Sequence, residues 1–156
     1  MVVPSFAYWD SCVFIDLLQQ TPSRFEACDD LRLQAEQKKL IIVTSTFALA
    51  EVCKLPGKTV SEKERQLIID FFENPYITVR QVDRRTAIRA GEIARQYGLK
   101  PPDSVHVATA EEAKVPVIYT YDGKLLKKNG KIGTPPIRIE EPPTPAAGPL
   151  YVKKKT

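Results

Sequence analysis

Short apolar runs rich in β-branched residues alternate along this chain with segments of helical character, and this alternation constrains the fold most strongly. Strands separated by helices predict a mostly parallel sheet that is covered on both faces. We therefore expect an α/β fold of three layers, with a mostly parallel sheet flanked by helices. The predicted strands span residues 6–9, 40–43, 76–82, 115–121 and 137–139.

Local signals mark where the predicted helices begin and end. Thr21-Pro22 is typical of a helix start, and Thr44 or Ser45 can cap the helix that carries residues 50–52. Gly98 is typical of a helix end, and Asp122-Gly123 is typical of a turn. Besides the helix that carries residues 50–52, the predicted helices span residues 12–18, 22–39, 61–72, 84–97 and 101–114.

The end of the chain differs in composition from the rest. Six prolines occur between residues 135 and 149, and three lysines follow at 153–155. Such a segment does not build a packed core. We expect one domain over residues 1–141 and a flexible Pro/Lys-rich tail over 142–156. The tail carries +3 of the net charge of +4, so the basic balance alone does not indicate a nucleic-acid face on the domain.

Composition excludes several classes of protein. No apolar run approaches the roughly 20 residues that cross a bilayer, and no basic start or signal sequence is recognisable, so a cytoplasmic location without membrane contact is expected. The chain has three widely spaced cysteines and one histidine, His106, which predicts free thiols and no structural zinc site. We expect His106 to pack or hydrogen-bond locally on its helix face.

Four acidic residues stand where strands end or the following helices begin. Asp10 and Asp122 directly follow predicted strands, Asp103 lies at a helix start, and Glu51 lies in the helix after the strand 40–43. These positions share one edge of a parallel sheet, where ligands of α/β folds bind. We expect the four carboxylates to converge there.

Convergence of carboxylates requires a counter-charge. Two of them about 4 Å apart repel by about 4 kcal/mol at an effective dielectric constant near 20. Mg²⁺ and Mn²⁺ favour oxygen ligands, and such ions assist displacement at phosphodiesters. The acids therefore predict metal-dependent phosphodiester hydrolysis.

Each acid also has a simpler interpretation. Asp10 and Asp103 can be ordinary helix caps, and Asp122 can be a turn residue. Glu51 can face solvent or pair with a neighbouring side chain. The matching positions of all four at strand ends favour a common site.

Four segments contain the four acids: residues 10–18 (DSCVFIDLL), 44–52 (TSTFALAEV), 103–110 (DSVHVATA) and 117–122 (VIYTYD). These segments resemble the motifs of PIN-domain nucleases, most nearly the VapC-like toxins of toxin–antitoxin pairs. The resemblance covers about residues 6–139, in the order and strand context of that family.

The resemblance implies a Mg²⁺- or Mn²⁺-dependent ribonuclease acting on single-stranded or structured RNA. It places Asp10, Glu51, Asp103 and Asp122 around the metal ion as catalytic residues and ligands. Glu51 would bind the ion directly or through water, or orient the nucleophile. It also implies supporting hydroxyl groups, which Ser11 and Thr120 provide.

The resemblance further implies a cognate antitoxin protein and a homodimer. Two alternatives remain open. The chain can be a non-catalytic PIN-fold module that binds RNA or protein, or it can be an RNA-processing nuclease unrelated to toxin–antitoxin pairs.

Overall fold

The central feature of the fold is a parallel sheet whose strand order reverses direction at its first strand. The computed structural model describes residues 3–55 and 59–145. Within these ranges the sheet has the order β3-β2-β1-β4-β5, and every pairing is parallel. The reversal at β1 leaves a switch point between β1 and β4, where α/β folds bind ligands. The strands are β1 (Ser5–Trp9), β2 (Leu40–Ser45), β3 (Ile77–Arg80), β4 (Val117–Tyr119) and β5 (Arg138–Glu140).

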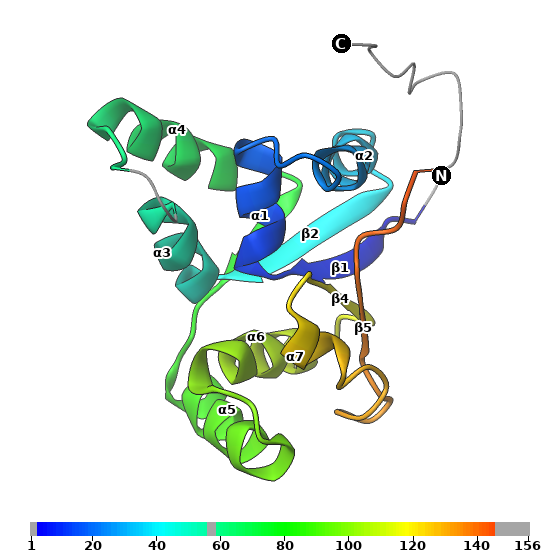
Figure 1. Cartoon of the computed structure of the whole chain (residues 1–156). Helices are drawn as coiled ribbons and strands as arrows, with labels where there is room; N and C mark the ends of the chain where they lie inside the picture. The colour runs from blue at the N-terminus through cyan, green and yellow to red at the C-terminus, as the bar shows by residue number, and fades with distance from the viewer. Residues whose placement is uncertain (1–2, 56–58, 146–156) are drawn as a thin grey trace.

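Helices cover both faces of the sheet, as the predicted three-layer α/β fold requires. In Figure 1, α1 to α4 lie above the sheet, and α5 to α7 lie below it. The helices are α1 (Ser11–Leu18), α2 (Phe25–Glu36), α3 (Thr46–Lys54), α4 (Glu62–Phe72), α5 (Arg84–Tyr97), α6 (Pro101–Glu112) and α7 (Gly123–Leu126).

The two faces of the sheet carry separate apolar cores. Successive side chains of a strand point to opposite faces, so neighbouring residues of β1 enter different cores. Trp9 packs with Phe14 of α1 in the upper core. Tyr8 lies in the lower core with Val107 of α6 and Ile93 of α5. This alternation aims the Tyr8 side chain toward α6.

The structure confirms most predicted elements and corrects several boundaries. The helix predicted over 84–97 is α5, and it ends at Gly98, whose φ of 67° is the left-handed conformation that glycine adopts easily. The second helix begins at Phe25 rather than at residue 22. The strand predicted over 115–121 is observed as the shorter β4. The turn predicted at Asp122-Gly123 opens the short helix α7.

Some expectations concern the ends of the chain and the membrane. Residues 142–145 have no regular structure, and the rest of the predicted tail lies outside the described residues. The domain limits of 1–141 and the flexibility of the tail therefore stay predictions. Among the described residues, no helix has the length and apolar content needed to span a membrane.

Candidate active site

The four acids predicted from the sequence belong to four different elements near the carboxyl edge of the sheet. Asp10 follows β1 and caps α1, and Asp122 caps α7 a few residues after β4. Glu51 lies on α3, which follows β2 directly, and Asp103 lies in the first turn of α6. The topology explains the placement, because strands β2, β1 and β4 are neighbours and all end at this edge.

Asp10 is the most firmly held of these acids. Only 5% of its surface is exposed. Its Oδ1 accepts a hydrogen bond of 2.7 Å from the backbone N–H of Ser11, and the Ser11 hydroxyl lies 3.4 Å from the same oxygen. Its Oδ2 accepts a hydrogen bond of 2.7 Å from the Thr120 hydroxyl. The carboxylate is therefore fixed by the first residue of α1 and by the residue that follows β4.

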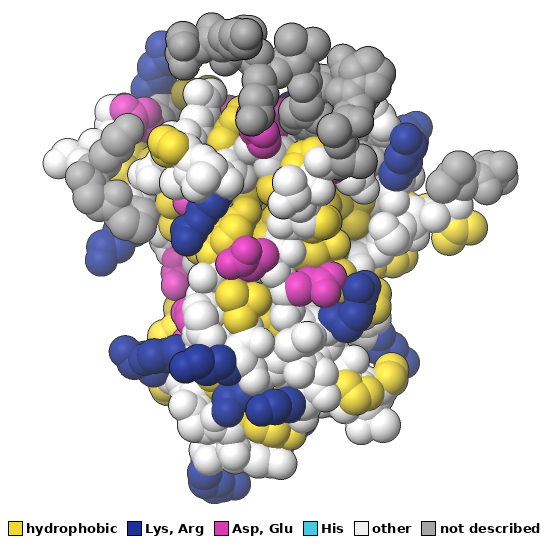
Figure 2. All heavy atoms as spheres, turned by 45° about the vertical axis from the view of Figure 1, so that its right-hand side comes forward, with side chains coloured by type: hydrophobic (Ala, Val, Ile, Leu, Met, Phe, Trp, Pro, Cys, Tyr) yellow, Lys and Arg dark blue, Asp and Glu magenta, His cyan; other side chains and the backbone are white. Residues whose placement is uncertain are grey.

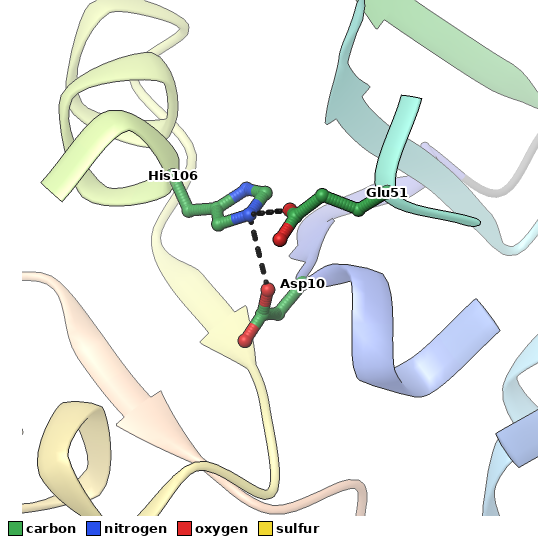
Figure 3. A group of neighbouring side chains, drawn as sticks. All are labelled: Asp10, Glu51 and His106. Carbon is green, nitrogen blue, oxygen red and sulfur yellow. Dashed lines mark hydrogen bonds and ion pairs between the residues drawn. The ribbon is translucent and has the colours of Figure 1, made fainter. Parts of the chain in front are cut away.

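Glu51 and Asp10 meet at the ring of His106, as Figure 3 shows. Nε2 of His106 lies 2.7 Å from Oε1 of Glu51 and 3.2 Å from Oδ1 of Asp10. The His106 side chain is buried, whereas one third of the Glu51 side chain is exposed. The ring is therefore buried beside the two carboxylates, and Glu51 is the more exposed of its two acidic neighbours.

The expectation that His106 packs is confirmed, because the residue is buried, but the expectation of a local hydrogen bond is wrong. Its hydrogen-bonding partners, Glu51 and Tyr8, are 55 and 98 residues away along the chain. Burial by itself would lower the pKa of His106, but the hydrogen bond to Glu51 and the negative charge of Asp10 raise it overall. One sequence signal could have revealed the role of this residue. It lies three positions after Asp103, so both belong to one face of α6.

The pKa of the Asp103 carboxyl group is raised above its ordinary value. Burial is the main cause that raises this pKa, and the negative charges of Asp122 and Asp10 raise it further. Asp103 is not a helix cap, because Lys100 occupies that position. The simple capping interpretation therefore fails for this residue, and like charges crowd around it.

Asp122 combines two roles. Its Oδ1 caps α7 by accepting a hydrogen bond of 2.8 Å from the backbone of Lys124. Its own backbone N–H donates to the Thr120 hydroxyl over 3.0 Å. Thr120 thus links Asp122 to Asp10, since the same hydroxyl donates to Asp10. Asp122 caps α7 and still interacts with another of the acids, because its negative charge raises the pKa of Asp103.

The donor set fits a hard divalent cation. Ligand atoms of Asp10, Glu51 and His106 all lie within 4.8 Å of one another, and Asp103 and Asp122 add negative charge nearby. Carboxylate oxygens are the ligands that Mg²⁺ and Mn²⁺ favour. A cation there would relieve the repulsion that raises the pKa of Asp103. The arrangement can therefore bind a divalent ion next to an exposed carboxylate.

Solved structures with a similar fold are bacterial toxins and their complexes. VapC20 of Mycobacterium tuberculosis, described as a toxin that cleaves the sarcin-ricin loop, is 16% identical with a TM-score of 0.63, over 75% of this chain and 90% of that one. A chain of the promoter-bound VapBC2 complex of Rickettsia felis is 17% identical with a TM-score of 0.62, over 87% and 98%. A toxin–antitoxin complex from Klebsiella pneumoniae is 22% identical with a TM-score of 0.58, over 74% and 86%. At these identities the likeness concerns the fold.

Sequence comparison gives the family. No curated protein matches the chain significantly. The family model of the PIN domain matches residues 7–131, which include the four acids, His106 and all seven helices. The three-layer fold and the match over most of the sequence agree, and the chain belongs to the PIN domain family.

Proposed function

We propose that this protein is a Mg²⁺- or Mn²⁺-dependent endoribonuclease that hydrolyses phosphodiester bonds of single-stranded RNA. The observation that supports the proposal is the close approach of Asp10 and Glu51 at His106, with the negative charges of Asp122 and Asp10 acting on Asp103. Crowded carboxylates are costly without a cation. Burial is the main cause that raises the pKa of Asp103, and the neighbouring charges of Asp122 and Asp10 raise it further. Membership of the PIN domain family supports a nuclease.

Each acid has its own role in this proposal. Asp10 and Asp103 are metal ligands, and Asp122 completes the acidic cluster. Glu51 binds the ion directly or through water, or orients the nucleophile. Ser11 and Thr120 hold Asp10 through the hydrogen bonds given above. When bound, the cation supplies charge neutralisation at the phosphate and activation of a water molecule as nucleophile.

The charge distribution supports a polyanionic substrate. Residues 84–131 contain ten lysines and arginines and five acids, a net charge of +5. These residues include α5, α6, β4 and α7, and the three helices are in the lower part of Figure 1. In Figure 2, Lys and Arg side chains gather on the lower part of the surface. Asp103 and Asp122 belong to this net-positive segment, which would attract RNA phosphates.

The biological setting that we propose is a toxin–antitoxin pair. The fold is similar to chains of two bacterial toxin–antitoxin assemblies. A cognate antitoxin would block the site by placing a basic side chain against the carboxylates, where it would compete with the cation. The homodimer implied by the resemblance stays a prediction.

RNA cleavage by purified protein tests the proposal. A single-stranded RNA would be incubated with wild-type protein and Mg²⁺, Mn²⁺ or EDTA, beside Asp10→Asn and Asp103→Asn. Asp83→Asn is the matched control, because Asp83 is an exposed acid that caps α5 and its charge is not among those that raise the pKa of Asp103. Cleavage that requires metal, persists in the control and disappears in the two site variants is the expected result.

Two outcomes would contradict the proposal. Equal cleavage by all variants would indicate a contaminating nuclease. Folded wild-type protein that binds neither metal ion and cleaves no RNA would favour the non-catalytic binding module instead. An adjacent antitoxin reading frame would separate a toxin from an RNA-processing nuclease.

A further inference from the structure

The hydrogen bonds of Glu51 differ from those of Asp10. Asp10 is held by Ser11 and Thr120 in addition to its contact with His106. Among the described residues, the Glu51 side chain has one hydrogen-bonding partner, which is Nε2 of His106. The orientation of Glu51 therefore depends on how the imidazole ring is held.

The ring is held from its other side by Tyr8. The Tyr8 hydroxyl lies 2.7 Å from Nδ1 of His106, and both residues are almost completely buried. Tyr8 belongs to the central strand β1, so it is a rigid support. Glu51 comes from α3 above the sheet and His106 from α6 below it, so the three residues join the two helical layers across the sheet edge.

The chemistry of the partners defines which ring nitrogen carries hydrogen. Nε2 faces oxygens of two carboxylates, which only accept hydrogen bonds when ionised. Nε2 must therefore carry a hydrogen and donate it. Nδ1 faces a hydroxyl group, which can donate to the ring. Burial raises the pKa of Tyr8 well above its ordinary value, so the hydroxyl keeps its proton.

We propose that Tyr8 and His106 form a buried relay that positions Glu51 beside Asp10, with Tyr8 orienting the ring and Nε2–H holding the carboxylate. This inference rests on the proposed function, because positioning Glu51 affects activity only if Glu51 takes part in metal binding. His106 is a positioning residue and not a metal ligand in this arrangement. Partners that orient carboxylate ligands in this way tune metal affinity.

Nitrogen NMR of the imidazole ring tests the relay directly. His106 is the only histidine of the chain, so its two ring nitrogens can be assigned without ambiguity in ¹⁵N-labelled protein. The relay predicts a protonated Nε2 in the metal-free protein and also after addition of Mg²⁺. A bare Nε2 in the metal-free protein, or loss of its hydrogen when Mg²⁺ binds, would overturn the inference, the latter by making His106 a ligand.

Mn²⁺ affinity tests whether the relay acts through Glu51. His106→Leu is expected to weaken binding about 10- to 100-fold, and Tyr8→Phe less. His106→Gln keeps an N–H donor of similar reach, so it should retain most of the affinity. In a Glu51→Gln background, His106→Leu should reduce the Mn²⁺ affinity little further, because the carboxylate that His106 positions is already absent. Circular dichroism and thermal melting of each variant verify folding.

The outcomes separate the relay from the proposed function. Wild-type affinity in His106→Leu, or an equal loss with and without Glu51, would overturn the relay and leave the metal site standing. Absence of Mn²⁺ binding by the wild-type protein would overturn the proposed metal site. The NMR measurement on metal-free protein would then still decide the hydrogen-bonding arrangement by itself.

Discussion

The starts of α5 and α6 each carry an aspartate, and the two residues behave in opposite ways. Asp83 caps α5 and is exposed, and its Oδ1 accepts hydrogen bonds from the backbone N–H and the hydroxyl of Thr86. These bonds lower its pKa. Asp103 lies in the first turn of α6, and burial and the charges of Asp122 and Asp10 raise its pKa. A helix start favours an acid in both places, so the surroundings at the sheet edge make the difference.

The largest expected difference between these two aspartates concerns RNA cleavage. Asp103→Asn should reduce the metal-dependent cleavage rate about a hundredfold or more, because even residues outside the ligand shell are worth 10- to 100-fold. Asp83→Asn should leave the rate within about twofold, since its partners are local to α5. Initial rates on one RNA at saturating Mg²⁺ measure both. Similar losses in the two variants would mean that Asp103 is an ordinary surface acid.

A second difference concerns the stability gained from metal binding. Mn²⁺ at 100 times its Kd should raise the free energy of unfolding of the wild-type protein by about 2.7 kcal/mol, and EDTA should abolish the gain. Asp83→Asn should show the same gain, and Asp103→Asn a much smaller one. Thermal melting at matched protein concentration reports this. A Mn²⁺ effect that survives in Asp103→Asn would remove that residue from the ligand set.

The smallest expected effect is on stability without metal, and its sign differs between the two positions. At neutral pH, Asp103→Asn should stabilise the protein by about 1 kcal/mol or less, because it removes a repelled charge that is partly screened by solvent. Asp83→Asn should lower the melting temperature, because the charged carboxylate is favoured at its cap. Melting in EDTA checks both signs, and a destabilising Asp103→Asn would contradict the repulsion.

The pH dependence of these differences follows from the same shifts. The stabilising contribution of a protonated Asp103 is fully present below its ordinary pKa of 3.8 and is lost as pH rises through the raised pKa. The contribution of Asp83 is present above 3.8 and is lost as pH falls through the lowered pKa. Both variants should therefore approach wild-type stability in acid. A melting series from neutral pH down to pH 3 in EDTA measures this, and an undiminished Asp103→Asn difference at the acid end would contradict the assigned shift.

The parts of the structure that local signals control could be predicted from the sequence. Gly98 predicts the end of α5, and the helix predicted over 61–72 is α4, which begins at Glu62 directly after its cap Ser61. The start of α2 could not be located, because Arg24 precedes it without any side-chain cap. The start of a helix could therefore be located from the sequence where a capping side chain precedes that helix.

The candidate acids could be named from the sequence, but the hydrogen bonds from Tyr8 through His106 to Glu51 could not. Their positions follow from strand order, which the alternation of strands and helices indicates. The links from His106 to Glu51 and Tyr8 join residues 55 and 98 positions apart, and no local pattern encodes such contacts.

Direct measurement of Mn²⁺ binding tests the central claim, that acids at the strand ends form one divalent-metal site. Titration of metal-free protein, followed by electron paramagnetic resonance of free Mn²⁺, would compare wild type with Asp10→Asn, Asp103→Asn and Asp83→Asn. The account predicts saturable binding by wild type and Asp83→Asn, and strongly weakened binding by the other two. Equal binding by all four proteins, or none by the wild type, would contradict it.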